Sequence, residues 1–241
     1  MSIFSFGIKL SFRSDGSINC RLMSFFDFKA PPSAKPTDTV KSPDFTIDPS
    51  RNLWFCLYIP STNGDDNAVN MPLIFYFHDG GFAWGGNLAH HVAVKACESE
   101  FKDLKIIGVI AIRPFFGGQE RMKLKQGLWG RLLLMYKARW VWRMFLPEER
   151  DHPMNIFGPK SEDISGLKFP ATIVVVGGFD PLQDWQKRYY EGLKKAGKEA
   201  YLIEYPNAFH AFYSVPELEE ASLFIDKVRE FMKKECAKRF H

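Results

Sequence analysis

The run Ala171–Gly177, which reads ATIVVVG, is the feature that most limits how this chain can fold. Its side chains are apolar at odd and even positions alike, so both faces of an extended strand would be apolar. A short run of this kind is typical of a strand in a parallel sheet, where helices cover both faces. The sequence therefore predicts an α/β architecture built around this strand.

The second half of the chain alternates strand and helix patterns. After that strand we expect a helix over residues 184–195 that ends near Gly197, a strand over 201–205, and an amphipathic helix over 218–234 with a basic end. Such alternation predicts a parallel sheet covered by helices. In sheets of this kind, reactive groups gather at the carboxyl ends of the strands.

The first half gives weaker patterns. Residues 30–43 are rich in Pro, Ser and Thr and indicate a connector. The remaining elements that we expect are two strands at 44–48 and 53–59, two buried strands at 73–77 and 106–112, and a helix over 87–99 with Asn87 as its N-cap.

Composition narrows the function classes. With 241 residues, 46% of them apolar and 15% aromatic, the chain suits a single domain, residues 1–241, with a large core. The net charge of +4 is well short of a nucleic-acid-binding footprint, so we expect no nucleic-acid partner. No window approaches the ~18 apolar residues of a membrane-spanning helix, so we expect no stable membrane insertion.

The cysteines and the first residues of the chain indicate the cellular compartment in which we expect the protein. The four cysteines are far apart and form no CxxC pair, which favours free thiols in a reducing compartment. Lys9 interrupts the apolar start, and no cleavage site follows, so a secretory signal is not expected. We therefore expect a cytoplasmic protein. No metal-ligand spacing and no phosphate loop are present, so we expect no cofactor and no metal.

Three places could carry chemistry. The sequence HDGGF begins at His78, directly after an expected strand, and its adjacent glycines, Gly80 and Gly81, could point backbone N–H groups at an oxyanion. Asp180 follows the strand ATIVVVG and His210 follows the strand YLIEY. Each has an ordinary alternative: a glycine turn, an acid at a helix start, and a packed core histidine.

Taken together, these motifs resemble a known family. An acid and then a histidine, each after a late strand, is the chain order of the Ser-Asp-His triad in α/β hydrolases. The sequence is similar to plant carboxylesterases of the hormone-sensitive-lipase-like group, which are relatives of the gibberellin receptors. The matching stretches are DGSINCRL, FDFKAPP, FHDGGF, GGNLAHHVAV, RPFFGG, FGPKSEDISG, FPATIVVVGGFDPLQDWQ and YLIEYPNAFHAFY. The resemblance implies the α/β-hydrolase fold, with Asp180 as triad acid, His210 as triad base, and Gly80 and Gly81 as oxyanion donors.

The nucleophile of that family is missing here. The family carries its serine in a GxSxG elbow, usually GDSAGGN followed by AHHVAV. Here GGNLAHHVAV begins at Gly85, and counting back places Ala83 at the serine position. The family separates the HDGGF-like motif from the elbow by several elements, or about 50 residues. We therefore infer an internal deletion, so that sheet strands are missing between the oxyanion motif and the elbow. A skipped exon or a faulty gene model would each explain it.

The loss of serine leaves three functions open. The first is a carboxylesterase-like hydrolase that no longer turns over, because losing the nucleophile alone costs about a million-fold in rate. The second is a gibberellin-like hormone-binding protein, although those receptors keep the serine and lose the histidine. The third is a non-functional truncated paralogue. The expected partner is a small-molecule ester or a hydrophobic acid, and the oligomeric state stays open.

Two further segments take their expected roles from the resemblance. Residues 1–43 would form an N-terminal lid or arm, and residues 120–150 a cap-like insertion. Residues 121–143 within that insertion carry seven basic side chains and no acidic one. A membrane-surface or anion-binding helix is the alternative, but basic side chains that snorkel to solvent fit a cap.

Overall fold

The computed structural model describes residues 33–37, 40–60, 72–77, 85–99, 101, 105–114, 116–117, 155–158, 161–180, 182–208 and 212–238. The chain divides into two compact units, Met1–Met71 and Pro72–His241. The expected lid or arm over residues 1–43 is described only from residue 33 onward, and the cap-like insertion over 120–150 lies outside the described residues.

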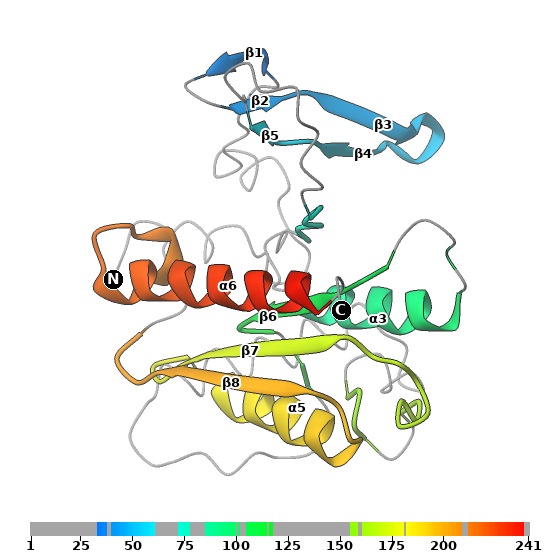
Figure 1. The fold of residues 1–241 in the computed structure, drawn as a ribbon, viewed down its shortest axis with the longest axis vertical. Helices are drawn as coiled ribbons and strands as arrows, with labels where there is room; N and C mark the ends of the chain where they lie inside the picture. Colours follow the sequence, from blue (N-terminus) through cyan, green and yellow to red (C-terminus); the bar gives the residue numbers. More distant parts are fainter. Residues whose placement is uncertain are drawn as a thin grey trace, which may run out of the picture. The chain divides into compact units, whose positions relative to one another are not determined.

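The first unit contains short antiparallel strands (Figure 1). Strand β3 (Asp44–Asp48) pairs with β4 (Leu53–Cys56) around the 3-10 turn η1 (Pro49–Arg51). In that turn the Ser50 N–H donates to Asp48 Oδ1 at 2.9 Å. A separate sheet has the strand order β1 (Ser33–Thr37), β2 (Val40–Ser42) and β5 (Ile59–Pro60).

These strands confirm part of the sequence prediction and correct the rest. Strand β3 has the expected bounds, whereas the expected strand at 53–59 is divided into β4 and β5. The connector predicted over 30–43 is wrong, because β1 and β2 both lie in it. Pro36 does not prevent β1 from forming, since β1 is an end strand of its sheet and an end strand can leave N–H positions unpaired.

The second unit is built on a parallel sheet. Its strand order is β6 (Gly108–Ile112), β7 (Ala171–Gly177) and β8 (Ala200–Tyr205), and Ile173 of β7 lies opposite Ile110 and Tyr201. The helices are α3 (Gly85–Glu98), α5 (Gln183–Lys195) and α6 (Glu219–Ala237), with the 3-10 turn η2 (Phe212–Ser214) before α6. The predicted α/β architecture is confirmed.

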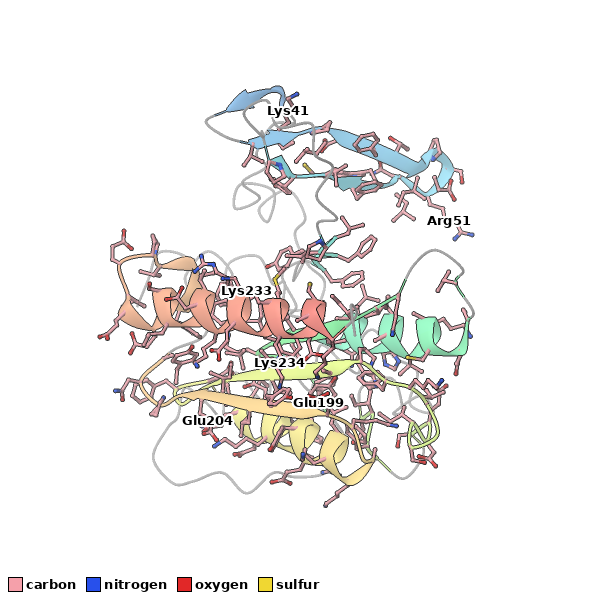
Figure 2. All side chains as sticks on the ribbon, in the orientation of Figure 1. Lys41, Arg51, Glu199, Glu204, Lys233 and Lys234 are labelled. Atoms are coloured by element: carbon pink, nitrogen blue, oxygen red, sulfur yellow. The ribbon has the colours of Figure 1, made fainter. Side chains whose placement is uncertain are left out.

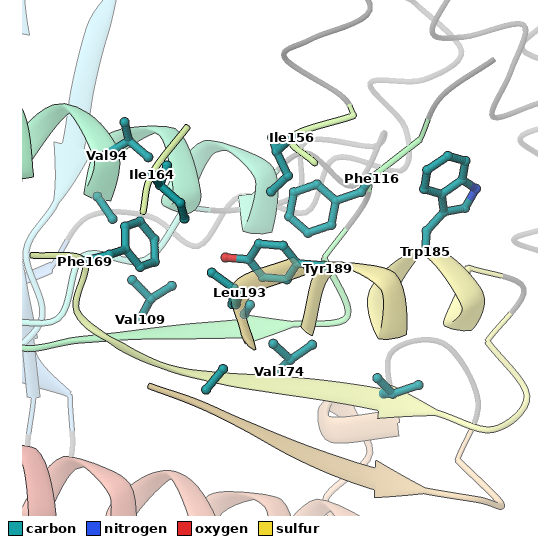
Figure 3. Packing of buried hydrophobic residues seen from close by; sticks show 14 residues of the cluster. Val94, Val109, Phe116, Ile156, Ile164, Phe169, Val174, Trp185, Tyr189 and Leu193 are labelled. Carbon is teal, nitrogen blue, oxygen red and sulfur yellow. The ribbon is translucent and has the colours of Figure 1, made fainter. Parts of the chain in front are cut away.

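Two hydrophobic clusters lie on opposite faces of this sheet. Val174 and Val176 of β7 pack with Tyr189 and Leu193 of α5 (Figure 3), and α3 adds Ala93 and Val94 to the same cluster. Residues on the other face, including Ile173 and Val175, pack with Phe224 and Phe231 of α6. Helix α6 therefore lies on one side of the sheet and α5 on the other (Figure 1). Full burial of one such aliphatic or aromatic side chain stabilises the fold by about 1.5–3 kcal/mol.

An exposed ionic network joins the end of α6 to the start of β8 (Figure 2). Lys238 Nζ donates to both carboxylate oxygens of Glu199 at 2.8 Å, and Lys234 Nζ lies 4.4 Å from the centre of the Tyr201 ring. The hydrogen bond from Lys238 is the main cause that lowers the pKa of Glu199. Because these groups are exposed, the network contributes little to stability and mainly fixes the position of the helix end.

Two expectations in the second unit are wrong. Residues 73–77 form no strand, and four of their side chains, from Leu73 to Tyr76, are 59–64% exposed. Within the described residues β6 pairs with β7 alone. No strand of the described residues pairs with the run, and its strand propensity alone does not make it a strand. Asn87 is no N-cap, because α3 already begins at Gly85 and buries Asn87.

None of the helices in the described part of the chain combines the length and the hydropathy that a bilayer crossing requires.

Candidate functional site

The carboxyl ends of the three parallel strands meet at one edge of the sheet. The backbone N–H of Arg113, just after β6, donates to the carbonyl of Val175 at 3.0 Å. After β7, the N–H of Gly178 donates to Tyr205 and the N–H of Phe179 donates to Ala208, at 2.9 and 3.1 Å. The segments that follow β6, β7 and β8 therefore lie side by side, as the sequence predicted for the reactive edge.

Asp180 is the centre of this edge. Its side chain is fully buried. Its Oδ1 accepts a hydrogen bond from the backbone N–H of Leu182 at 2.9 Å, and its Oδ2 accepts one from Gln186 Nε2 at 3.1 Å. The Arg113 guanidinium Nη1 lies 3.9 Å from the same Oδ2. A buried carboxylate held in this way keeps one orientation at the end of β7.

The alternative role of Asp180, as an acid at a helix start, is also present. Leu182 is the residue before α5, and its N–H points to the carboxylate. A carboxylate offers about four lone-pair positions, so a role at a helix start and a role in a triad do not exclude each other.

Two glycines allow the close packing of this edge. A Cβ atom on Gly178 would lie 2.0 Å from the carbonyl oxygen of Pro206, after β8. A Cβ atom on Gly86 would lie 2.6 Å from Cβ of Pro114, after β6. The first close approach joins the segments after β7 and β8, and the second holds the start of α3 against the carboxyl end of β6.

The structure places two of the expected site residues. Asp180 lies at the reactive edge, and Gly85 is the buried first residue of α3. The others lie outside the described residues: His78, Gly80, Gly81, Ala83 and His210. The described chain that leads to His210 ends at Ala208, which is buried and accepts the hydrogen bond from Phe179.

Sequence reasoning missed two residues that contact Asp180. Arg113 carried a signal, because it is a charged residue directly after a predicted buried strand, in the stretch RPFFGG. The rule that placed reactive groups at strand ends applies to it as well. Gln186 carried no such signal, since it lies inside a helix six residues after Asp180.

His90 of α3 lies in a buried aromatic environment. It is 3% exposed, is hydrogen-bonded through Nδ1 to the Tyr189 hydroxyl at 3.2 Å, and is surrounded by aromatic rings, among them Phe116 and Phe169. Burial lowers the pKa of His90 to about 3 and raises the pKa of Tyr189. Across the described ranges, no cluster of three or more His, Cys, Asp or Glu residues could hold a metal ion.

Comparison with known proteins gives a matching family model and two kinds of plant relative, gibberellin receptors and a carboxylesterase. The family model described as alpha/beta hydrolase fold matches residues 80–214. Gibberellin receptor GID1C of Arabidopsis thaliana is 30% identical over 323 aligned positions, which cover 98% of this chain and 93% of the receptor. Gibberellin receptor GID1B of the same plant is 39% identical, covering 65% of this chain and 44% of the receptor. Probable carboxylesterase 8, also from Arabidopsis thaliana, is 30% identical, covering 64% of this chain and 48% of that protein.

Solved structures agree on the fold. Vibralactone cyclase superposes with a TM-score of 0.51 at 22% sequence identity, covering 65% of this chain and 48% of that one. A fungal esterase from Rhizomucor miehei has the same TM-score and identity, covering 63% of this chain and 47% of that one. The parallel sheet, the helices on its two faces and these matches lead to one conclusion: the chain belongs to the alpha/beta hydrolase fold family and is a relative of plant carboxylesterases and gibberellin receptors.

Proposed function

We propose that this chain is a carboxylesterase-like protein that keeps an acid and a base but lacks the serine nucleophile, and so does not turn over esters. One observation carries the proposal. Asp180 is buried at the end of β7, and the segment after β8 is bonded beside it at Ala208, two residues before His210. This arrangement supports an Asp180–His210 pair.

Each group would have a defined part in ester cleavage. A serine hydroxyl would attack the ester carbonyl, His210 would take its proton, and Asp180 would hold the imidazole in the required orientation. Backbone N–H groups at Gly80 and Gly81 would stabilise the oxyanion. Ala83 has no hydroxyl, so the first bond cannot form. A negative charge on Asp79, next to Gly80, would further oppose an oxyanion.

The alignment supports an internal deletion. The match to gibberellin receptor GID1C runs over 323 positions, more than the 241 residues of this chain, so some receptor segments have no counterpart here. We place the loss between HDGGF and Gly85. Sequencing full-length transcripts across this junction tests it: longer transcripts that encode GDSAGG there would mean that this chain is a defective version of an ordinary serine esterase.

Ester cleavage tests the missing nucleophile directly. The full chain and its His210→Ala variant are assayed with p-nitrophenyl acetate and p-nitrophenyl butyrate, and both are treated with a fluorophosphonate probe that labels activated serines. We expect equal hydrolysis by the two proteins and no labelling. Turnover above the His210→Ala control, or labelling that His210→Ala abolishes, would overturn the proposal.

Small-molecule binding is a second candidate, favoured by the similarity to gibberellin receptor GID1C over 98% of the chain. A site without turnover could still hold a hydrophobic acid. Titration calorimetry with a gibberellin as the probe would show saturable binding if this second function is present. Heats indistinguishable from the heat of dilution would rule out gibberellin binding.

A further inference from the structure

Arg113 is an unusual residue in two respects. Its side chain is 2% exposed, and its backbone has a φ of 46°, in the left-handed region that residues other than glycine rarely adopt. Burying a charged group is costly unless it is paired, and a left-handed conformation adds strain. Both costs fall on one residue, at the carboxyl end of β6 and beside the candidate site.

The surroundings of Arg113 show what compensates these costs. The guanidinium lies 3.9 Å from Asp180 Oδ2 on one side. Its central carbon lies 5.0 Å from the ring centre of Tyr213 and 5.9 Å from that of Phe212, both in η2. Aromatic faces attract a guanidinium, and more strongly when water is excluded. Arg113 thus connects the ends of β6 and β7 with the turn that follows β8.

We propose that Arg113 is a positioning residue that holds the Asp180 carboxylate and shares it with His210, which makes His210 a weaker base. The inference rests on the Asp180–His210 pair of the proposed function. A histidine beside a lone carboxylate gains proton affinity from the negative charge. Beside a carboxylate already paired with a guanidinium, it meets a pair whose net charge is zero, and most of that gain is lost.

The charge of Arg113, and not its hydrogen-bonding capacity, is what matters in this arrangement. Gln186 provides a matched comparison, because its amide donates to the same Oδ2 and it is also fully buried but neutral. The charged and titratable side chains that meet at this point include Arg113 after β6, Asp180 after β7 and Tyr213 in η2. Removing the guanidinium takes away the positive charge beside the Asp180 carboxylate.

The experiment follows the imidazole of His210 by NMR as a function of pH in the full chain, with its signal assigned by loss in His210→Ala. In Arg113→Gln we expect the midpoint of the His210 titration to rise by about one pH unit. In Arg113→Lys, which keeps the charge, and in Gln186→Leu, which removes only an amide, we expect a smaller change. A second variant, Tyr213→Leu, loosens the guanidinium without removing either charge, and should move the midpoint in the same direction as Arg113→Gln.

The variant Asp180→Asn distinguishes a failure of the proposed role of Arg113 from a failure of the Asp180–His210 pair. If Asp180→Asn lowers the His210 midpoint but neither Arg113→Gln nor Tyr213→Leu raises it, the role of Arg113 is refuted and the acid–base pair stands. If Asp180→Asn also leaves the midpoint unchanged, the acid–base pair itself is refuted, and the inference falls with it. An Arg113→Gln protein that does not fold leaves Tyr213→Leu to decide.

Discussion

One buried side chain, His90, makes the stability of this protein depend on pH. His90 is packed among aromatic rings with 3% of its surface exposed, and burial lowers its pKa from 6.5 to about 3. In the unfolded chain the imidazole takes up a proton near pH 6.5, whereas in the folded chain it does so only near pH 3. Between these values the unfolded state binds more protons, so stability is complete above pH 6.5 and falls as the pH is lowered.

We expect the free energy of unfolding to fall by about 3 kcal/mol through His90 alone when the pH is lowered from 7 to 4. Urea denaturation at several pH values measures it. In His90→Gln the loss over this range should be smaller by that amount, whatever its stability at pH 7. The neighbouring variant His91→Gln should change the slope much less, because the charge of His91 is the smaller of the two causes that lower the pKa of His90. Equal slopes for His90→Gln and wild type would show that His90 is not buried in neutral form.

The candidate site shows at this scale what a sequence can predict. Asp180 was identified because an acid after a buried strand stands in the chain order of a known triad. Arg113 has the same kind of position after a predicted strand, but the sequence shows neither its left-handed backbone nor the aromatic rings around it. Its partners Asp180 and Tyr213 lie 67 and 100 residues further along the chain. Only the folded sheet brings the three residues together.

At the scale of elements, the spacing between the ends of β7 and β8 depends on Gly178. An added Cβ would meet the Pro206 carbonyl oxygen at 2.0 Å, and backbone atoms cannot move aside cheaply. We expect Gly178→Ala to lower the free energy of unfolding by about 2–4 kcal/mol. Gly166→Ala is the matched control, since nothing lies within 4 Å of its added Cβ, and it should change stability by less than about 0.5 kcal/mol. Urea midpoints compare the two, and similar values would contradict the close approach.

The run at 73–77 is a second case at this scale. Its sequence LIFYF is strongly β-prone and uncharged, and Phe75 is 64% exposed. Such exposed runs pair with other chains and promote aggregation. We expect Phe75→Lys to slow aggregation, which is followed by light scattering at 37 °C. The free energy of unfolding should stay within about 0.5 kcal/mol of wild type.

Val174→Lys is the contrasting control for that run, because Val174 is fully buried in β7 and a charge there should unfold the protein. If Phe75→Lys were as destabilising as Val174→Lys, Phe75 would be a core residue of the working protein.

The elements also show where sequence patterns fail. Strand β7 was predicted with its bounds, because an apolar run that is buried on both faces needs only helices to cover it. Residues 73–77 have the same kind of pattern, but no strand in the described part of the chain pairs with them, so strand propensity alone did not decide the outcome. Strand β1 was missed for the opposite reason: its composition predicts a connector, but pairing with β2 makes it a strand.

At the scale of the whole molecule, the question is whether the parallel sheet of the second unit and the helices on its two faces fold as one cooperative unit. The two hydrophobic clusters of the second unit share strand β7, since its alternate side chains pack against α5 on one face and α6 on the other. Damage to either cluster should therefore weaken the same sheet. A non-functional remnant should instead show no single cooperative unfolding transition.

We expect Val174→Ala, on the α5 face, and Phe231→Leu, on the α6 face, each to destabilise by about 2 kcal/mol. Both should shift one and the same thermal transition, followed by circular dichroism, because the two faces unfold together. The double variant should lose about the sum, since the two side chains lie on opposite faces and share no cluster. Surface variants such as Lys187→Gln provide the control. A broad loss of signal without a transition, or shifts of two different transitions by the two variants, would mean that the sheet of the second unit does not fold cooperatively, and would favour a non-functional truncated paralogue over the proposed esterase-like protein.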